Sequence, residues 1–336
     1  MLNVRMWGRA IRVIPRLSRE EWGRLDFVSR WLVATRSAVL FMTLVSSSLG
    51  GLLALRSGQG RAWLWALTTL GLLLAHATNN LINDLTDHLT GADRDNSFRA
   101  QYGPHPIEHG LMSKAQLIGY AAVTGALALA IGVFLAWHGG MPVVWLLASG
   151  VFFVLFYTYP LKYFGMGELA VLAVWGPLMV GGTYLTTTGS WSWDAAIASL
   201  PYALSASTVI FGKHIDKLAS DEAKRIRTLP VLIGERAARS IAVAMLLLQY
   251  ALVGLLVYRG IVGPVVLCVL LALPRCVRVV QAYLSPRPAA PPPEMPAGIW
   301  PLWFVALAFW HARLFGMLLI GGLIADTVLH RLHIPG

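Results

Sequence analysis

The chain has 336 residues, of which 57% are apolar and only 13% are charged, and its formal net charge is +11. Soluble domains carry roughly 25% charged residues, so this composition excludes an ordinary soluble protein and indicates a polytopic membrane protein. The basic residues are spread over several loops and do not form one patch with interleaved aromatic residues. The positive charge therefore favours anionic lipid headgroups and an anionic substrate as partners, and not nucleic acid.

Nine apolar segments approach or reach the length of about 20 residues that a helix needs to cross a bilayer. Their approximate limits are 31–55, 62–78, 115–137, 142–158, 167–187, 195–211, 240–257, 262–280 and 299–325. We expect an all-α fold in which nine transmembrane helices occupy residues 31–326. A basic segment at 1–30 precedes this domain and a short tail at 327–336 follows it. The first segment lacks a continuous apolar stretch, so we do not expect a secretory signal peptide.

The positions of Lys and Arg predict the orientation of the spans. If the N-terminus is cytoplasmic, the cytoplasmic segments contain 21 of the 27 basic residues and the external segments contain four. The external four are Arg56, Arg61, Arg259 and Arg331. Because positive residues accumulate on the cytoplasmic side, we expect a multi-pass protein of the cytoplasmic (inner) membrane with its C-terminus outside.

Polar residues occupy the end of the second apolar segment. Asn80, Asn83, Asp84 and Asp87 are spaced three or four residues apart and so share one face of a helix. A carboxylate in a membrane helix costs a few kcal/mol unless it faces a cavity or binds a cation. Carboxylate and amide oxygens are the ligands that Mg²⁺ prefers. The sequence therefore predicts an Mg²⁺ site here, in which Asp87 has a catalytic role.

A second acidic cluster, Asp216 and Asp221, follows the sixth apolar segment. Two separated clusters of this kind suggest a diphosphate that metal ions bridge, and we assign Asp221 a catalytic role together with Asp87. Positive side chains accompany both clusters, namely Arg36, Arg99, Lys162 and Lys213. They could bind phosphate oxygens, but the excess of positive charge on the cytoplasmic side would also supply them. Arg36 lies inside the first predicted span, where a side chain that reaches back to the surface is the alternative.

Other chemistries have little support in the sequence. There is no Gly-x-x-x-x-Gly-Lys-Ser/Thr motif and no strand, Gly-x-Gly-x-x-Gly and helix arrangement, so a nucleotide site is not expected. Cys268 and Cys276 lie eight residues apart in or near one span and are expected to be packing residues.

The segment Asn83-Asp84-Leu85-Thr86-Asp87 resembles the first Asn/Asp-rich signature of the UbiA superfamily of intramembrane aromatic prenyltransferases. The extension to Gly91-Ala92-Asp93 is similar to the subgroup that prenylates 1,4-dihydroxy-2-naphthoate in menaquinone synthesis. Residues 165–184 are similar to the fifth span of that subgroup, and residues 221–234 to the second Asp loop of the superfamily.

The resemblance implies a role for individual residues. Metal ligands would be Asn83, Asp84, Asp87, Asp93, Asp216 and Asp221, and the diphosphate would be bound by Asn83, Arg36, Arg99, Tyr157, Lys162 and Lys213. The chain departs from the motifs of the superfamily in two respects, and both concern the identity of the acceptor. Gly91 stands at the usual third motif position, with Asp93 as the substitute, and four residues instead of three separate the two aspartates of the second motif.

Together these features predict a prenyltransferase with a central cavity that opens to the cytoplasm. Two Mg²⁺ ions would bind a polyprenyl diphosphate and stabilise the diphosphate as it leaves. The acceptor would be an aromatic quinone precursor such as 1,4-dihydroxy-2-naphthoate, and the alternatives are another phenol, a chlorin-type ring or a polar lipid. A non-catalytic transporter that uses the carboxylates as an ion path is the alternative from another class, but transporters bind their cargo near the bilayer midplane.

Overall fold

The computed structural model describes residues 2–92, 103, 105–293, 295 and 299–332. Within these residues the chain is helical and contains no strand, which confirms the all-α class. In chain order the elements are α1 (Val4–Arg12), α2 (Arg19–Gly23), α3 (Phe27–Ala34), η1 (Ser37–Val39), α4 (Phe41–Arg56), α5 (Ala62–Leu89), α7 (Lys114–Gly139), α8 (Met141–Phe156), η2 (Leu161–Phe164), α9 (Gly167–Ala173), η3 (Val174–Gly181), α10 (Gly182–Thr188), α11 (Trp193–Ala198), α12 (Leu200–Asp216), α13 (Leu218–Ala223), α14 (Leu229–Ile233), α15 (Glu235–Tyr258), η4 (Pro264–Ala272), α16 (Leu273–Leu284) and α17 (Phe304–Leu332).

Seven helical segments in the described part of the chain are long and apolar enough to cross a membrane. They are Ser37–Arg56, Lys114–Gly139, Gly167–Thr188, Trp193–Asp216, Glu235–Tyr258, Pro264–Leu284 and Phe304–Leu332. The two other predicted spans correspond to α8, which is shorter, and to α5, which is long but carries the polar residues. Helices therefore form at all nine predicted positions, while the number that cross the bilayer stays a prediction.

The first predicted span starts later than residue 31. The helix that contains Trp31 ends at Ala34, and Arg36 adopts a left-handed backbone conformation with φ of 55°. This conformation is unfavourable for a residue with a Cβ atom and breaks the helix. The Thr35 hydroxyl donates to the Trp31 carbonyl at 2.8 Å and the Ser37 hydroxyl to the Leu32 carbonyl at 2.7 Å, so the broken end keeps hydrogen-bond partners.

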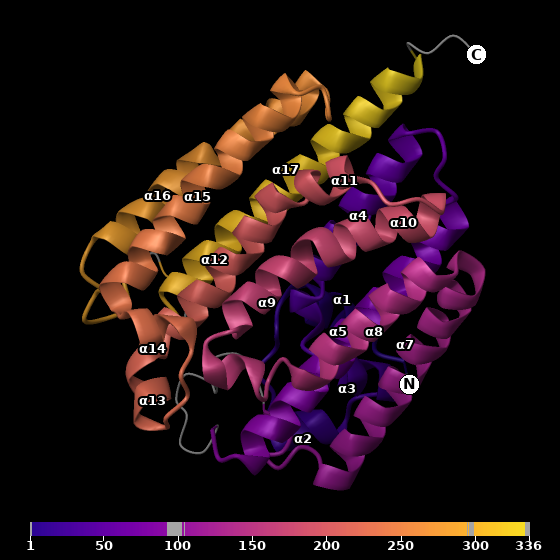
Figure 1. Ribbon diagram of the computed structural model, residues 1–336. Helices are drawn as coiled ribbons and strands as arrows, with labels where there is room; N and C mark the ends of the chain where they lie inside the picture. Colours follow the sequence, from indigo (N-terminus) through magenta and orange to yellow (C-terminus); the bar gives the residue numbers. More distant parts are fainter. Residues whose placement is uncertain (1, 93–102, 104, 294, 296–298, 333–336) are drawn as a thin grey trace.

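Helix α12 lies in the middle of the bundle and packs against α9, α15 and α17. Figure 1 shows α15 and α16 on one side of it and α5, α7 and α8 on the other. Most of α12 is buried, whereas most of α7 is exposed. Because the exposed residues of α7 are largely apolar, we infer that α7 faces lipid.

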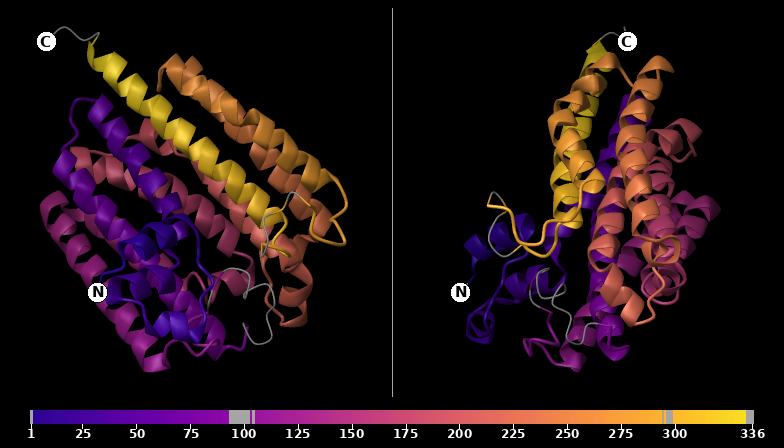
Figure 2. Two further views of the ribbon diagram at one scale, coloured as in Figure 1. Left: turned by 180° about the vertical axis from the view of Figure 1, so that it is seen from behind. Right: turned by 90° about the vertical axis from the view of Figure 1, so that its left-hand side faces the viewer.

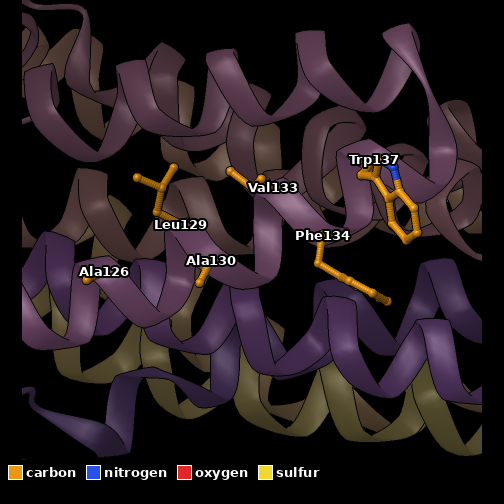
Figure 3. Close-up of a pocket in the computed structure, with 6 residues that line it drawn as sticks. All are labelled: Ala126, Leu129, Ala130, Val133, Phe134 and Trp137. Carbon is orange, nitrogen blue, oxygen red and sulfur yellow. The ribbon is translucent and has the colours of Figure 1, made fainter.

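A shallow groove on α7 illustrates this apolar surface (Figure 3). It is lined by Ala126, Leu129, Ala130, Val133, Phe134 and Trp137. These residues recur every three or four positions and form one exposed stripe of the helix. The stripe contains no titratable side chain, so it has no group for acid–base or metal chemistry.

The fifth predicted span bends in its middle. At Gly176 the backbone leaves the helical region, with ψ of −117°, and Pro177 follows without an N–H donor. The Ser46 hydroxyl of α4 donates to the Trp175 carbonyl at 2.7 Å and so supplies a partner at the bend. The bend thus keeps α9 against α12 while α10 packs against α4 and α5.

The polar end of α5 and the C-terminus lie at opposite ends of the molecule. Helices α13 and α14 and the polar end of α5 lie at one end, and α11 and the C-terminus lie at the other (Figures 1 and 2). At the C-terminal end, Arg56 Nε donates to Asp326 Oδ2 at 2.8 Å and joins α4 to α17. Helix α17 continues to Leu332, six residues into the predicted tail.

The basic N-terminal segment is folded against the helical bundle. Asp26 caps α3 by accepting from Ser29 N at 3.0 Å, and it also accepts from Asn3 N at 3.0 Å and Trp7 Nε1 at 3.1 Å. Arg19 Nε donates to the Gly110 carbonyl at 2.9 Å. These contacts fix α1 and α2 near the loop that follows α5.

Candidate active site

The polar face that the sequence predicts on α5 is buried in the structure. Asn80, Asn83, Asp84 and Asp87 are all less than 9% exposed, and Asp84 is 0% exposed. Unpaired carboxylates at such depth would be costly, so each requires a cationic or hydrogen-bonding partner. The partners, and the second acidic cluster, come from three other parts of the chain.

Arg36 supplies the first of these partners. The break between α3 and η1 places its guanidinium against α5, where Nη2 donates to the Asn80 carbonyl at 3.1 Å and to Asn83 Oδ1 at 3.3 Å. The same nitrogen lies 3.5 Å from Asp84 Oδ1, and the Arg36 side chain is 11% exposed. The guanidinium is therefore directed into the protein and not toward the membrane surface.

Lys162 supplies the second partner from the segment between α8 and α9. Its Nζ donates to Asp87 Oδ1 at 2.6 Å, and both side chains are less than 10% exposed. Asn83 Nδ2 donates to Asp87 Oδ2 at 3.2 Å and to Thr158 Oγ1 at 3.1 Å. Burial alone would lower the pKa of Lys162, but the Asp87 carboxylate outweighs burial and raises the pKa above its usual value. Lys162 is therefore an ammonium at neutral pH.

The third part is the junction of α12 and α13. Lys217 Nζ lies 3.2 Å from Asp221 Oδ1, and Asp221 is 1% exposed. The angles at this contact do not satisfy a hydrogen bond, and both Asp221 oxygens are buried without a hydrogen-bond partner among the described residues. The Asp221 carboxylate is near enough to Lys162 to add, after Asp87, to the rise in the pKa of that lysine. One carboxylate of each acidic cluster, Asp87 and Asp221, thus acts on the same lysine.

Tyr157 and Lys213 also lie at this site. The charges of Asp87 and Arg36 act on Tyr157. Lys213 is within electrostatic range of Arg36, Lys162 and Asp87. The structure therefore brings the predicted diphosphate-binding residues of the described chain together. Asp93 and Arg99, which the sequence also assigns to the site, lie outside the described residues.

Asp216, which the sequence assigns to the metal site together with Asp221, has another environment. Its Oδ1 accepts from Phe304 N at 3.1 Å and its Oδ2 accepts from Val305 N at 3.0 Å, so the carboxylate caps the start of α17. Arg287 Nη2 lies 3.8 Å away as a further partner. The first amides of a helix lack intrahelical acceptors, and a carboxylate there is stabilising. Both oxygens of Asp216 are thus already engaged.

Four polar residues of this region were not expected from the sequence. Thr158 bonds to Asn83, and Lys217 pairs with Asp221, as described above. A buried pair also links Glu168 of α9 to His214 of α12, with 2.5 Å between Oε1 and Nδ1. The position of Glu168 at the second residue of an apolar segment was the available signal, because a carboxylate there needs a partner.

The site combines carboxylates and cations in pairs, Asp84 with Arg36, Asp87 with Lys162 and Asp221 with Lys217. Among the residues that the structure describes, no three His, Cys, Asp or Glu side chains converge on one point. A metal ion would therefore need amide, phosphate or water oxygens in addition to the carboxylates, as is usual for Mg²⁺.

A model of the UbiA prenyltransferase family matches residues 43–305. The chain belongs to the UbiA prenyltransferase family. The matched segment includes the polar face of α5, Lys162 and Asp221, so the whole site except Arg36 lies inside it. The family consists of prenyltransferases, which confirms the predicted enzyme class at the level of the family.

Relatives in other organisms are distant. The UbiA prenyltransferase domain-containing protein 1 homolog of Drosophila melanogaster is 25% identical over 233 residues, which cover 66% of this chain and 63% of the fly protein. The 1,4-dihydroxy-2-naphthoate octaprenyltransferase of Bacillus subtilis is 24% identical over 257 residues, 75% and 81% of the two chains. The protoheme IX farnesyltransferase 2 of Chromobacterium violaceum is 28% identical over 240 residues, 70% and 75% of the chains. The names of the last two relatives refer to different acceptors.

Solved structures of the family share the fold. A UbiA homolog from Aeropyrum pernix K1 has a TM-score of 0.66 at 17% identity and covers 85% of this chain and 98% of its own. A UbiA homolog from Archaeoglobus fulgidus bound to DMAPP and Mg²⁺ has a TM-score of 0.53 at 13% identity, with 86% and 98% covered. The resemblance to the UbiA superfamily and the helical membrane fold are thus confirmed, while the role of each site residue stays a prediction.

Proposed function

We propose that this UbiA-family protein transfers a polyprenyl group from its diphosphate to an aromatic acceptor in an Mg²⁺-dependent reaction. The observation that carries the proposal is the convergence of Asp87, Lys162 and Asp221, from three separate parts of the chain, at one end of a bundle of apolar helices. A polyprenyl diphosphate has the same division, with a charged head and a long apolar tail. The helices would bind the tail and the polar end would bind the head.

The residues on α5 fit an Mg²⁺ ion. Asn83, Asp84 and Asp87 offer hard oxygen atoms on one helical face, and Asp84 and Asp87 are buried beside cations. When bound, Mg²⁺ would neutralise the diphosphate and make it a better leaving group. The Archaeoglobus fulgidus homolog was solved with Mg²⁺ and DMAPP, which supports this metal for the family.

The basic residues would hold and stabilise the diphosphate. Lys162, Lys213 and Arg36 would donate hydrogen bonds to the phosphate oxygens, and charge-assisted bonds of this kind strengthen as negative charge grows there. The allylic C–O bond breaks and its electron pair goes to the diphosphate. The electron-rich acceptor ring then forms the new C–C bond with the prenyl carbon and releases the proton from that ring carbon. The apolar helices exclude water, which would otherwise capture the cation.

The acceptor we propose is 1,4-dihydroxy-2-naphthoate or a related quinone precursor, which would place the protein in menaquinone synthesis. The motif at Gly91-Ala92-Asp93 and the naphthoate octaprenyltransferase of Bacillus subtilis support this acceptor. The alternatives are another phenol, a chlorin-type ring or a polar lipid. The protoheme IX farnesyltransferase 2 of Chromobacterium violaceum favours the chlorin-type ring among them. We further propose that the site opens to the cytoplasm, with the N-terminus on the same side, because basic residues dominate that side.

The test is an assay of the purified protein in lipid nanodiscs with a panel of prenyl diphosphates and aromatic acceptors. We expect prenylated product and diphosphate only when Mg²⁺ is present. Asp87→Ala and Asp221→Ala should each lower turnover by about a hundredfold or more. Exposed Glu222, beside Asp221 in sequence, provides the control Glu222→Ala, which should retain turnover. Absence of prenyl transfer with every donor and acceptor would refute the proposal.

A further inference from the structure

Lys217 and Asp216, which are adjacent at the α12–α13 junction, have different partners. Adjacent residues on a helix differ in direction by about 100°, so only one of these two can face a given neighbour. Asp216 faces α17 and accepts two of its amides. Lys217 faces Asp221, four residues later, at 3.2 Å.

Asp221 is consequently the one carboxylate that this junction contributes to the site. Both of its oxygens are buried and lack a hydrogen-bond partner among the described residues, and the Lys217 ammonium is the cation in contact with it. A divalent ion held by Asp221 would lie beside this ammonium and be repelled by it. It would also lack a second buried carboxylate from α12 or α13, because Asp216 is engaged elsewhere and Glu222 is exposed. The second acidic cluster therefore does not fit a metal ion in the way that the sequence predicts.

We propose that the Lys217 ammonium takes the place of a second metal ion at this site. One Mg²⁺ would then bind on the α5 side of the diphosphate, and Lys217, held by Asp221, would supply the positive charge on the α13 side. The inference rests on the proposed function, since it assumes that a prenyl diphosphate occupies the site. The sequence predicts two Mg²⁺ ions at this site, whereas the structure leads us to expect one Mg²⁺ ion and the Lys217 ammonium.

The test counts metal ions and needs no turnover. The protein in nanodiscs, with a non-hydrolysable geranyl diphosphate analogue, is titrated with Mn²⁺ and the bound ion is measured by electron paramagnetic resonance. We expect one Mn²⁺ per chain. The Lys217→Asp variant, which puts a carboxylate four residues before Asp221, should bind two. The Lys114→Asp variant makes the same charge change at an exposed lysine at the start of α7, and should bind one.

A second variant keeps the proposal testable if Lys217→Asp does not fold. Lys217→Gln removes the charge but keeps a polar side chain of similar length. It should weaken binding of the analogue by about tenfold or more, with the count still at one Mn²⁺. Two Mn²⁺ ions in the unchanged protein, or full affinity for the analogue in Lys217→Gln, would overturn the inference. If the expected Mn²⁺ counts were found but no prenyl transfer occurred, the proposed function would be overturned and the inference on Lys217 would stand.

Discussion

The ion pair between Lys162 and Asp87 gives the most direct test of the site. In Lys162→Met the methylene stem is largely kept and the charge is lost, so Asp87 remains buried with the Asn83 amide as its donor at 3.2 Å. Removing one partner of a buried pair costs about 3 to 5 kcal/mol of stability. The loss of one charge-assisted bond to the diphosphate adds a separate cost in donor binding of about 1.5 to 3 kcal/mol, or roughly 10- to 150-fold in affinity.

Two measurements separate these effects. Thermal unfolding in nanodiscs without Mg²⁺ measures the loss of stability, and binding of the geranyl diphosphate analogue at a temperature where the variant is folded measures the loss of affinity. Lys114→Met is the matched control, because Lys114 is an exposed lysine at the start of α7. An affinity for the donor in Lys162→Met equal to that of the control would show that Lys162 does not bind diphosphate.

The pH dependence of this effect also follows from the structure. The pKa of Lys162 is raised by Asp87, so the contribution of its charge is complete below the pKa of the unfolded chain and is lost only as pH rises through the higher folded value. The ratio of donor affinities between the unchanged protein and Lys162→Met should therefore stay constant from about pH 7 to pH 9. A ratio that falls toward one in this range would mean that Lys162 loses its proton there and contradict the assigned ion pair.

Three further predictions address other parts of the molecule. Asp216→Ala should lower stability by about 1 to 3 kcal/mol through loss of the α17 cap but leave the Mn²⁺ count at one per chain, whereas a lower count would restore Asp216 as a metal ligand. Asp326→Ala should lower the unfolding temperature through loss of a bond worth about 1.5 to 3 kcal/mol and leave the donor Michaelis constant unchanged, and a raised constant would contradict this separation of the two ends. With both native cysteines replaced, cysteines at Ser220 and Ser190 should react with an impermeant thiol reagent from opposite sides of the membrane, and labelling from one side would refute the predicted topology.

The sequence was sufficient for the helical membrane fold because the relevant signals are local. Apolar segments of nearly bilayer length predict helices without knowledge of their neighbours. The polar face of α5 was also predictable, since the spacing of Asn83, Asp84 and Asp87 follows the helical period. Burial of these residues confirms that inference.

Local signals did not give the limits of the first span or the partners of the buried charges. The left-handed turn at Arg36 lies within an apolar run, and only its contacts with α5 explain why it is tolerated. Lys162 and Asp87 are 75 residues apart, and no pattern in the sequence joins them. Their pairing depends on how α8 and α9 pack beside α5.

The junction of α12 and α13 shows the same limit most clearly. Asp216 and Asp221 are equivalent as acidic residues in the sequence, and each could bind a metal ion. At the start of α17, about 90 residues later in the chain, the backbone amides lack intrahelical acceptors, and two of them donate hydrogen bonds to Asp216. Lys217 is thereby the residue turned toward Asp221. The sequence determined which charged groups are present, and the tertiary structure decided their partners, because the free energy of a buried charge depends on the groups packed against it.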